Sequence, residues 1–345
     1  MVKYVLKIAK RTKGLRIALI LALLLMPASL KGQDPQFSQF YANPLYLAPS
    51  FAGLTEGSRI GTNYRNQWPQ LPGNFITYTF SYDHNFDAFN SGAGVLLMRD
   101  QAGSGNLSTT NIGVQYSYDF AINNFWRVRP GIHFLYNQRS IDFERLLFND
   151  QIRPGGNLPS SIEIPPLSKV YSVDFSASAM AYSESYWFGF TLDNLLRPNQ
   201  SFYDFDGDEF DVARKPVKIS IFGGTKFVRE GRLIRPLAES LQLAFLYRNQ
   251  GSYNQLDLGM YWYKNPLVLG VWYRGIPGIS SGGGSDAAIF LVGYKIDQFN
   301  IGYSYDFSVS RLIGSTGGAH EISITFSWSS VRIPRKPTMV PCPEF

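Results

Sequence analysis

The chain has 345 residues and a formal net charge of +6, and aromatic side chains make up 15% of it. Seven of its 32 basic residues precede residue 33 and no acidic residue does, so the rest of the chain has 25 basic and 26 acidic residues, a net charge of −1. This balance argues against a nucleic-acid partner, and the many aromatic residues exclude an intrinsically disordered chain.

The amino terminus has the three-part order of a secretory signal peptide. A basic stretch is followed by an apolar run over residues 17–26, then by Pro27 and small residues. We predict a signal peptide over residues 1–32 with cleavage after Gly32, and an uncleaved anchor is the alternative. The apolar run is shorter than the roughly 20 residues of a membrane-spanning helix, so any membrane role of the mature chain has to come from strands.

The next segment, residues 33–57, fits no regular element. Its aromatic residues follow neither a helical nor a strand period. Pro35, Pro44 and Pro49 divide it into short pieces, because proline interrupts backbone hydrogen bonding. We expect a packed leader that plugs the mouth of a barrel.

From Ser58 onward the sequence repeats segments in which apolar and polar residues alternate. In residues 111–120 every second side chain is apolar, and those between are mainly small or polar; residues 300–307 repeat this order. A period of two predicts β-strands, and most predicted strands have about the 9–11 residues that a tilted strand needs to cross a bilayer. The fourteen predicted strands cover residues 58–68, 74–84, 91–100, 108–120, 125–138, 170–182, 185–195, 215–227, 239–249, 253–264, 266–275, 286–296, 298–309 and 319–329.

The two faces of these strands favour a membrane barrel over a soluble β-sandwich. The polar face carries mainly Gly, Ser, Thr and Ala, which suit a crowded lumen, so we expect the apolar face to meet lipid. Connections after odd-numbered strands include long ones, such as 140–169 and 196–214, and those after even-numbered strands are mostly short. Outer-membrane barrels have short periplasmic turns, longer external loops and, with an even strand count, both chain ends in the periplasm.

The aromatic residues near the strand ends are interpreted as belts at the two membrane boundaries, and cross-strand pairs in a soluble sandwich are the alternative. The sequence thus predicts an all-β fold, a single transmembrane antiparallel β-barrel of about 14 strands over residues 58–330. A leader over 33–57 precedes it and a periplasmic tail over 331–345 follows it. The residues assigned to the belts include Tyr116, Tyr118, Trp126, Tyr186, Trp187, Tyr261, Trp262, Tyr263, Trp272 and Tyr273.

No catalytic, cofactor-binding or metal site is predicted. His84, His133 and His320 lack the spacing of a zinc site, and no Gly-x-Ser-x-Gly elbow supplies a serine nucleophile. A rim enzyme with a Ser–His pair from distant strands stays open as an alternative. The acidic loop 204–211 departs from the EF-hand order, so we interpret it as a solvated loop, with a calcium site as the alternative.

Basic residues gather in two places that this topology puts in the periplasm. They suit solvated turns or a docking surface for an acidic periplasmic partner. The tail, residues 331–345, has four prolines, which favour an extended segment that another protein can bind. Cys342 is the only cysteine and has no internal disulfide partner. The basic residues are Lys226, Arg229, Arg232, Arg235, Arg332, Arg335 and Lys336.

The leader and the first strand resemble a known family. Residues 33–49 and 51–53, followed by Tyr64-Arg65-Asn66-Gln67-Trp68, are similar to the opening signature of the PorP/SprF family, outer-membrane proteins of the Bacteroidota type IX secretion system. The resemblance implies a role in secretion and in attaching a secreted partner, such as a gliding adhesin, to the cell surface. It also implies periplasmic PorK/PorN-type ring components as partners. The basic tail does not follow the family pattern.

Our leading hypothesis is a non-enzymatic outer-membrane barrel without cofactors. It sits in outer-membrane lipid, docks a secreted surface protein through its outer loops, and makes periplasmic contacts through its basic turn and tail. The alternative is a passive pore for a hydrophobic or small polar solute, with the aromatic leader as its hatch.

Overall fold

The computed structural model describes residues 34–73, 75–152, 161, 167–203, 213–229, 239–275, 287–309 and 316–329. The chain forms two compact units, Met1–Asp34 and Pro35–Phe345, and the fold belongs to the second. The predicted signal peptide, the acidic loop 204–211 and the tail 331–345 lie outside the described residues. So do Arg232 and Arg235 of the basic turn.

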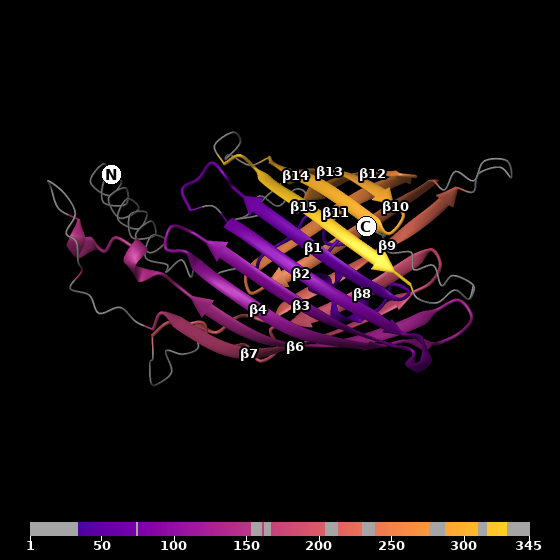
Figure 1. Ribbon diagram of the computed structural model, residues 1–345, viewed down its shortest axis with the longest axis horizontal. Helices are drawn as coiled ribbons and strands as arrows, with labels where there is room; N and C mark the ends of the chain where they lie inside the picture. The colour runs from indigo at the N-terminus through magenta and orange to yellow at the C-terminus, as the bar shows by residue number, and fades with distance from the viewer. Residues whose placement is uncertain are drawn as a thin grey trace, which may run out of the picture. The chain divides into compact units, whose positions relative to one another are not determined.

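The described part of the second unit is built almost entirely from antiparallel strands (Figure 1). All fourteen predicted strands are present, and their ends differ from the prediction by at most three residues. The strands are β1 (Ser58–Gln67), β2 (Phe75–Phe86), β3 (Ser91–Ala102), β4 (Leu107–Tyr118), β5 (Phe120–Ala121), β6 (Arg127–Ser140), β7 (Lys169–Tyr182), β8 (Tyr186–Asp193), β9 (Lys218–Arg229), β10 (Glu239–Gln250), β11 (Tyr253–Lys264), β12 (Leu267–Arg274), β13 (Ala287–Ile296), β14 (Phe299–Ser308) and β15 (Ala319–Trp328).

The sheet closes on itself. Apart from β4 and β5, strands that are neighbours in the sequence pair with each other, and β1 pairs with β15. The pairing of β4 with β6 continues the ring past the short strand β5. In the described residues the result is a closed barrel of fourteen antiparallel strands with one extra short strand. Closure leaves no unpaired sheet edge, as a sheet surrounded by lipid requires. The predicted fold class is confirmed and a soluble β-sandwich is excluded.

The predicted strand 108–120 is interrupted at one residue. β4 ends before Asp119, and β5 (Phe120–Ala121) then resumes pairing with β6. The backbone N–H of Asp119 donates instead to the carbonyl of Asn90 at 2.8 Å, and its carboxylate accepts two bonds from Arg127 at 3.0 and 3.1 Å. These bonds turn the backbone away from the ladder, which an alternating pattern cannot reveal.

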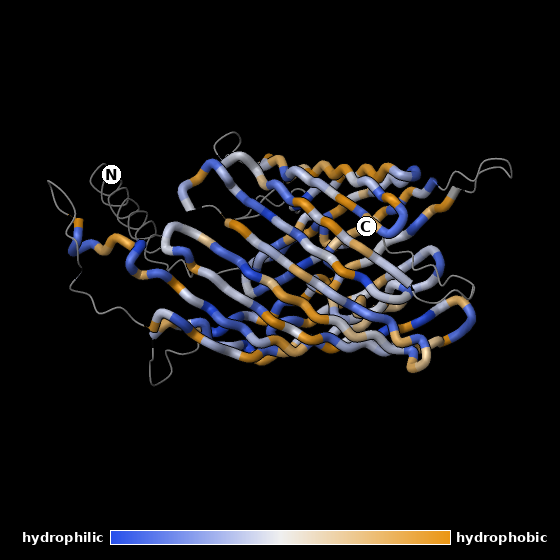
Figure 2. The backbone as a smooth tube through the Cα atoms, viewed as in Figure 1, coloured by the Kyte–Doolittle hydropathy of each residue, from blue (hydrophilic) through white to orange (hydrophobic). Residues whose placement is uncertain are grey.

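The apolar faces of the strands point outward. Ile112 and Val114 on β4 are 48% and 56% exposed, whereas Gln115 and Ser117 are at most 3% exposed. Figure 2 shows hydrophobic and hydrophilic residues alternating along the strands. This is the inverse of a soluble core and fits a barrel whose outer wall meets lipid.

The two ends of the barrel differ. The turn end (right in Figure 1) carries the helix η2 (Asp87–Phe89) and mostly short connections, although the one from β9 to β10 is longer. The loop end carries the connection from β6 to β7, with η3 (Phe143–Arg145) and η4 (Asn149–Gln151), and the connection from β8 to β9. Within the described residues, no helix has the length and apolarity that a bilayer crossing requires.

Candidate functional site

The leader lies inside the barrel. It contains α2 (Pro44–Leu47) and η1 (Pro49–Phe51), too short to form a helical domain, and its polar groups bond to side chains that the strands direct inward. A segment without internal regular structure satisfies its backbone groups from its surroundings, and here the surroundings are the barrel wall. Its apolar side chains at most 4% exposed include Phe37, Phe40, Tyr41, Leu45 and Phe51.

Ser38 and Gln39 hold the leader near the loop end. The carboxylate of Glu321 on β15 accepts both of their backbone N–H groups, at 2.7 Å from Ser38 and 3.0 Å from Gln39. The Gln39 amide donates to the Ser304 hydroxyl at 3.1 Å and accepts from the Ser323 hydroxyl at 2.6 Å. The wall therefore recognises both the backbone and the side chains of this pair.

The Ser38 hydroxyl lies between charged groups. It donates to Asp306 on β14 at 2.6 Å and accepts from Arg65 on β1 at 2.8 Å and from Arg274 on β12 at 2.9 Å. Bonds to charged partners are the stronger ones, especially away from water. We define the loop-end clamp as Ser38 and Gln39 with Arg65, Arg274, Asp306 and Glu321.

This clamp belongs to a buried ionic network whose formal charges balance. Arg65 and Arg274 both contact Asp306, at 2.8 and 2.9 Å. Three arginines face three carboxylates, so the wall needs no charge from the leader and can hold its neutral groups in a buried site. The six members are Arg65, Arg248, Arg274, Asp257, Asp306 and Glu321.

A second set of bonds fixes the leader at the turn end. Arg129 donates to the carbonyl oxygens of Ala52 at 2.6 Å and Gly53 at 2.9 Å, and the Ser117 hydroxyl donates to the Ala52 carbonyl at 2.7 Å. The Gly53 N–H donates to Asp83 at 2.9 Å. We define the turn-end clamp as Ala52 and Gly53 with Arg59, Asp83, Ser117 and Arg129, in which Arg59 pairs with Asp83 at 2.9 Å.

The turn-end clamp depends on close backbone approach. A Cβ atom at Gly92 on β3 would lie 2.1 Å from the Ala52 carbonyl oxygen and 2.6 Å from Arg129. Gly53 has a φ of +62°, in the left-handed region that favours glycine. The turn-end clamp therefore forms because Gly53 and Gly92 have no side chains that would block the approach of the backbone.

Between the clamps, inward-facing polar side chains bond to the leader from several strands. They satisfy leader groups that would otherwise be buried without partners. The bonds, between 2.7 and 3.2 Å long, join Asn43 to Thr79, Gln115 to the Leu45 carbonyl, Thr191 to the Leu47 carbonyl and the Ser50 N–H to Ser178.

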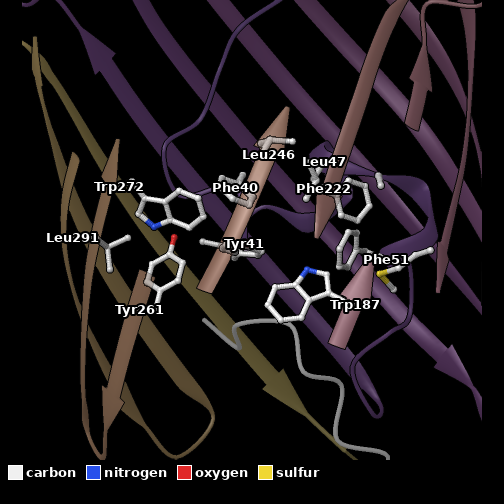
Figure 3. Packing of buried hydrophobic residues seen from close by; sticks show 14 of the residues in the cluster. Phe40, Tyr41, Leu47, Phe51, Trp187, Phe222, Leu246, Tyr261, Trp272 and Leu291 are labelled. Atoms are coloured by element: carbon white, nitrogen blue, oxygen red, sulfur yellow. The ribbon is translucent and has the colours of Figure 1, made fainter. Parts of the chain in front are cut away.

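An aromatic cluster packs the leader against β7 to β13 (Figure 3). Aromatic ring pairs with centroids about 4.5–7 Å apart stabilise a fold by more than the burial of their apolar area alone. The centroid distances are 4.9 Å for Phe40 and Trp272, 5.5 Å for Tyr41 and Tyr261, and 5.5 Å for Phe51 and Phe222.

The belt assignment is wrong for Trp187, Tyr261 and Trp272, which are each 2% exposed and face the lumen. The interior is also less uniformly small than expected. Glycines on adjacent strands make room for the large rings, and a Cβ at Gly259 would lie 2.1 Å from the Trp272 ring. Tyr186, by contrast, is 54% exposed on the outer wall.

At the loop end, connections far apart in the sequence are bonded together. Arg139 donates to the carbonyl of Gln200 at 3.0 Å, and the Leu167 N–H donates to the Phe202 carbonyl at 3.0 Å. The β6–β7 and β8–β9 connections are thus joined into one surface at the loop end. Its exposed apolar residues are Leu147, Ile152, Leu167, Leu196 and Tyr203.

The three histidines lie on separate strands. His84 on β2 is 2.7 Å from the Ser58 hydroxyl, and His320 on β15 is 2.8 Å from the Tyr303 hydroxyl. His133 is buried on β6. The described residues contain no group of three or more His, Cys, Asp or Glu side chains that could hold a metal. The Ser58–His84 contact is a single pair at the turn end.

Sequence reasoning missed the charged members of both clamps. Arg65 lies within the family-like motif 64–68, but no residue spacing shows that its side chain meets Asp306 and Glu321, which are more than 240 residues away. The available signal was the placement of charged residues on the polar face of predicted strands. Only the register between the strands shows that these residues lie at the same level along the barrel axis.

The fold is similar to solved outer-membrane proteins of low sequence identity. The toluene transporter TodX of P. putida has 8% identity and a TM-score of 0.46, with 82% of this chain and 93% of that chain covered. A FadL homologue of Pseudomonas aeruginosa has 12% identity and a TM-score of 0.42, covering 87% and 95%. Omp33 of Acinetobacter baumannii has 10% identity and a TM-score of 0.43, covering 80% and 100%. None of these likenesses extends to function.

None of the curated proteins matches the sequence. One family model does, over residues 29–326, and its description is type IX secretion system membrane protein PorP/SprF. The match includes the leader, both clamps and nearly all of the barrel.

Proposed function

Because the chain belongs to the PorP/SprF family of type IX secretion system membrane proteins, we propose that it docks a secreted surface protein, such as a gliding adhesin, at the outer membrane. The family and the barrel together give the outer-membrane location. In this proposal the barrel is a scaffold and not an enzyme, and the signal peptide over residues 1–32 directs its export.

The occupied lumen carries the proposal. The leader is bonded to the wall at both ends and packed against aromatic side chains between them. A hatch would have to break the bonds at both ends to open, so an interior held in this way favours a protein that acts through its surfaces over a conduit for solutes. This is the observation that favours docking over the passive pore.

The loop end supplies the surface that the proposal uses. Bonded connections present Leu147, Ile152 and Leu167, each more than half exposed, outside the strands. Contiguous exposed apolar patches mark protein interaction sites, and in this proposal these residues form one. The periplasmic ring components implied by the family would meet the opposite end.

The test is retrieval of partners from detergent-solubilised outer membranes with a tagged chain. The wild-type chain is expected to recover a secreted protein and type IX components. Leu147→Asp with Ile152→Asp should abolish recovery of the secreted protein, because charges would enter the proposed contact.

Ile122→Asp is the matched control. Ile122 is 65% exposed, but it lies in the β4–β6 turn at the opposite end of the barrel. This variant should keep the secreted protein. Recovery of the wild-type barrel with no secreted protein and no type IX component would overturn the proposal, as would equal loss in both variants.

A further inference from the structure

The leader has a fixed direction inside the barrel. Ser38 and Gln39 bond to Glu321, at the start of β15, and that strand begins at the loop end. Ala52 and Gly53 bond to the other end of the lumen, a few residues before β1 begins there. The chain therefore crosses the lumen once, from the loop end to the turn end, before it enters the sheet.

The burial of the leader follows the same direction. Pro35 and Gln36 are half-buried, whereas every residue from Phe37 to Leu45 is buried. A gradient of this kind is expected where a segment passes from the mouth of a barrel into its packed interior. Residues 35 and 36 thus mark the mouth at the loop end.

The start of the leader also adjoins the base of a long loop. The Tyr46 hydroxyl donates to the Pro35 carbonyl, and the Tyr46 ring meets Phe37 edge-on at 5.1 Å. Lys218 lies 5.3 Å above the Tyr46 ring and pairs with Asp193 at 3.1 Å. These two charged residues end β8 and begin β9, so they flank the β8–β9 connection.

We infer that residues 35 and 36 belong to the outer interaction surface, because the leader enters the lumen from the side that carries the long loops. The amino-terminal side of the leader then faces outward, whereas the even strand count predicted both chain ends in the periplasm. β15 itself ends at the periplasmic turns. The partner that fits this surface is the secreted protein of the proposed function, which would contact the loops and the start of the leader together. The partner assignment rests on that proposed function, and the direction of the leader does not.

Cysteine labelling tests the direction. In a Cys342→Ser background, which removes the only native cysteine, Gln36→Cys is treated with a membrane-impermeant maleimide in intact cells. Ser252→Cys, in the exposed β10–β11 turn, marks the loop end, and Glu184→Cys, in the exposed β7–β8 turn, marks the turn end. We expect the maleimide to label Gln36→Cys and Ser252→Cys in intact cells. It should label Glu184→Cys only after the outer membrane is permeabilised.

Labelling of Gln36→Cys only after permeabilisation, together with Glu184→Cys, would overturn the inference. Because Gln36 is half-buried, a second measurement uses an epitope inserted between Asp34 and Pro35. Antibody binding to this epitope in intact cells supports the outward start of the leader. Absence of both labelling and antibody binding overturns it.

Photo-crosslinking tests the partner. A photoreactive residue in place of Gln36 should capture the same secreted protein as one in place of Leu147, and one in place of Ala88, in η2 at the turn end, should not. Capture at Leu147 but not at Gln36 would overturn the shared surface. Capture at neither position would instead count against the proposed function.

Discussion

The two clamps hold the same segment by different chemistry. The loop-end clamp recognises side chains as well as backbone, since the Ser38 hydroxyl and the Gln39 amide are both bonded. The turn-end clamp recognises mainly carbonyl oxygens, which every residue has, and relies on Gly53 and Gly92 for space. The loop-end clamp depends on the side chains of Ser38 and Gln39, whereas the turn-end clamp depends on the absence of side chains at Gly53 and Gly92.

The difference also concerns freedom of the chain. Gly53 lies five residues before β1, so the turn end of the leader is tied to the sheet by the covalent chain. At the loop end, the bonds of Ser38 and Gln39 restrain the segment that precedes the packed interior. We therefore expect replacement of the charged residues of the loop-end clamp to loosen the leader at the loop end. Larger residues in place of the glycines should displace it at the turn end.

The largest effect is expected from removing the leader. Deletion of residues 35–48 removes Ser38 and Gln39, the leader's part of the loop-end clamp, and the leader's residues Phe40 and Tyr41 of the aromatic cluster. It should create a steady conductance in planar bilayers where the full-length chain shows none. Phe40→Ala with Phe51→Ala, which thins the leader and keeps both clamps, should give a smaller rise. Equal conductance of the full-length and deleted chains would mean that the leader does not seal the lumen.

Breaking the ionic network should come next. Arg65→Ala leaves Asp306 and Glu321 buried with one cation fewer, and the loss of one partner of a buried pair typically costs about 3–5 kcal/mol. Urea unfolding of the barrel in detergent measures this free energy. The control is Arg145→Ala, an exposed arginine paired with Asp142, where about 0–1 kcal/mol is expected. Equal losses would contradict a structural role for the network.

Bulk at the turn end should have an intermediate effect. Gly92→Ala places a methyl group against the Ala52 carbonyl, and overpacking of this kind costs about 1–3 kcal/mol. Limited proteolysis of the leader and urea unfolding are the measurements. Ala93→Val, on the adjacent half-exposed position, adds more bulk toward the outer wall and should leave both unchanged. A greater loss of unfolding free energy in Ala93→Val than in Gly92→Ala would contradict the close approach of the leader backbone to Gly92.

The last effect, no larger than that of Gly92→Ala, distinguishes two serines of the leader. Ser38→Ala removes a hydroxyl with three charged partners, and leaving such groups unsatisfied costs about 1–3 kcal/mol. Ser50→Ala is the control, because the buried Ser50 hydroxyl has no hydrogen-bond partner among the described residues. Unfolding should separate the two variants. If Ser50→Ala is as destabilising as Ser38→Ala, the hydroxyl contacts of the clamp do not stabilise the leader.

Alternation, together with the turn residues between segments, located the fourteen strands, and alternation gave the outward direction of residues such as Ile112 and Val114. Side-chain direction in a strand is a local property with a period of two, so a short window contains it. Turn lengths supplied the two ends of the barrel. The aromatic residues of β8, β11 and β12 escaped this reasoning, because both faces of those strands carry large side chains.

The sequence by itself thus determined a membrane barrel with a non-strand leader, because lipid selects one face of every strand. Only the tertiary structure decided where the leader runs and what holds it. Arg65, Asp306 and Glu321 meet because closure brings β1 beside β15, which is paired with the preceding strand β14. Contacts between such distant residues depend on register around the whole ring, and no local pattern encodes it.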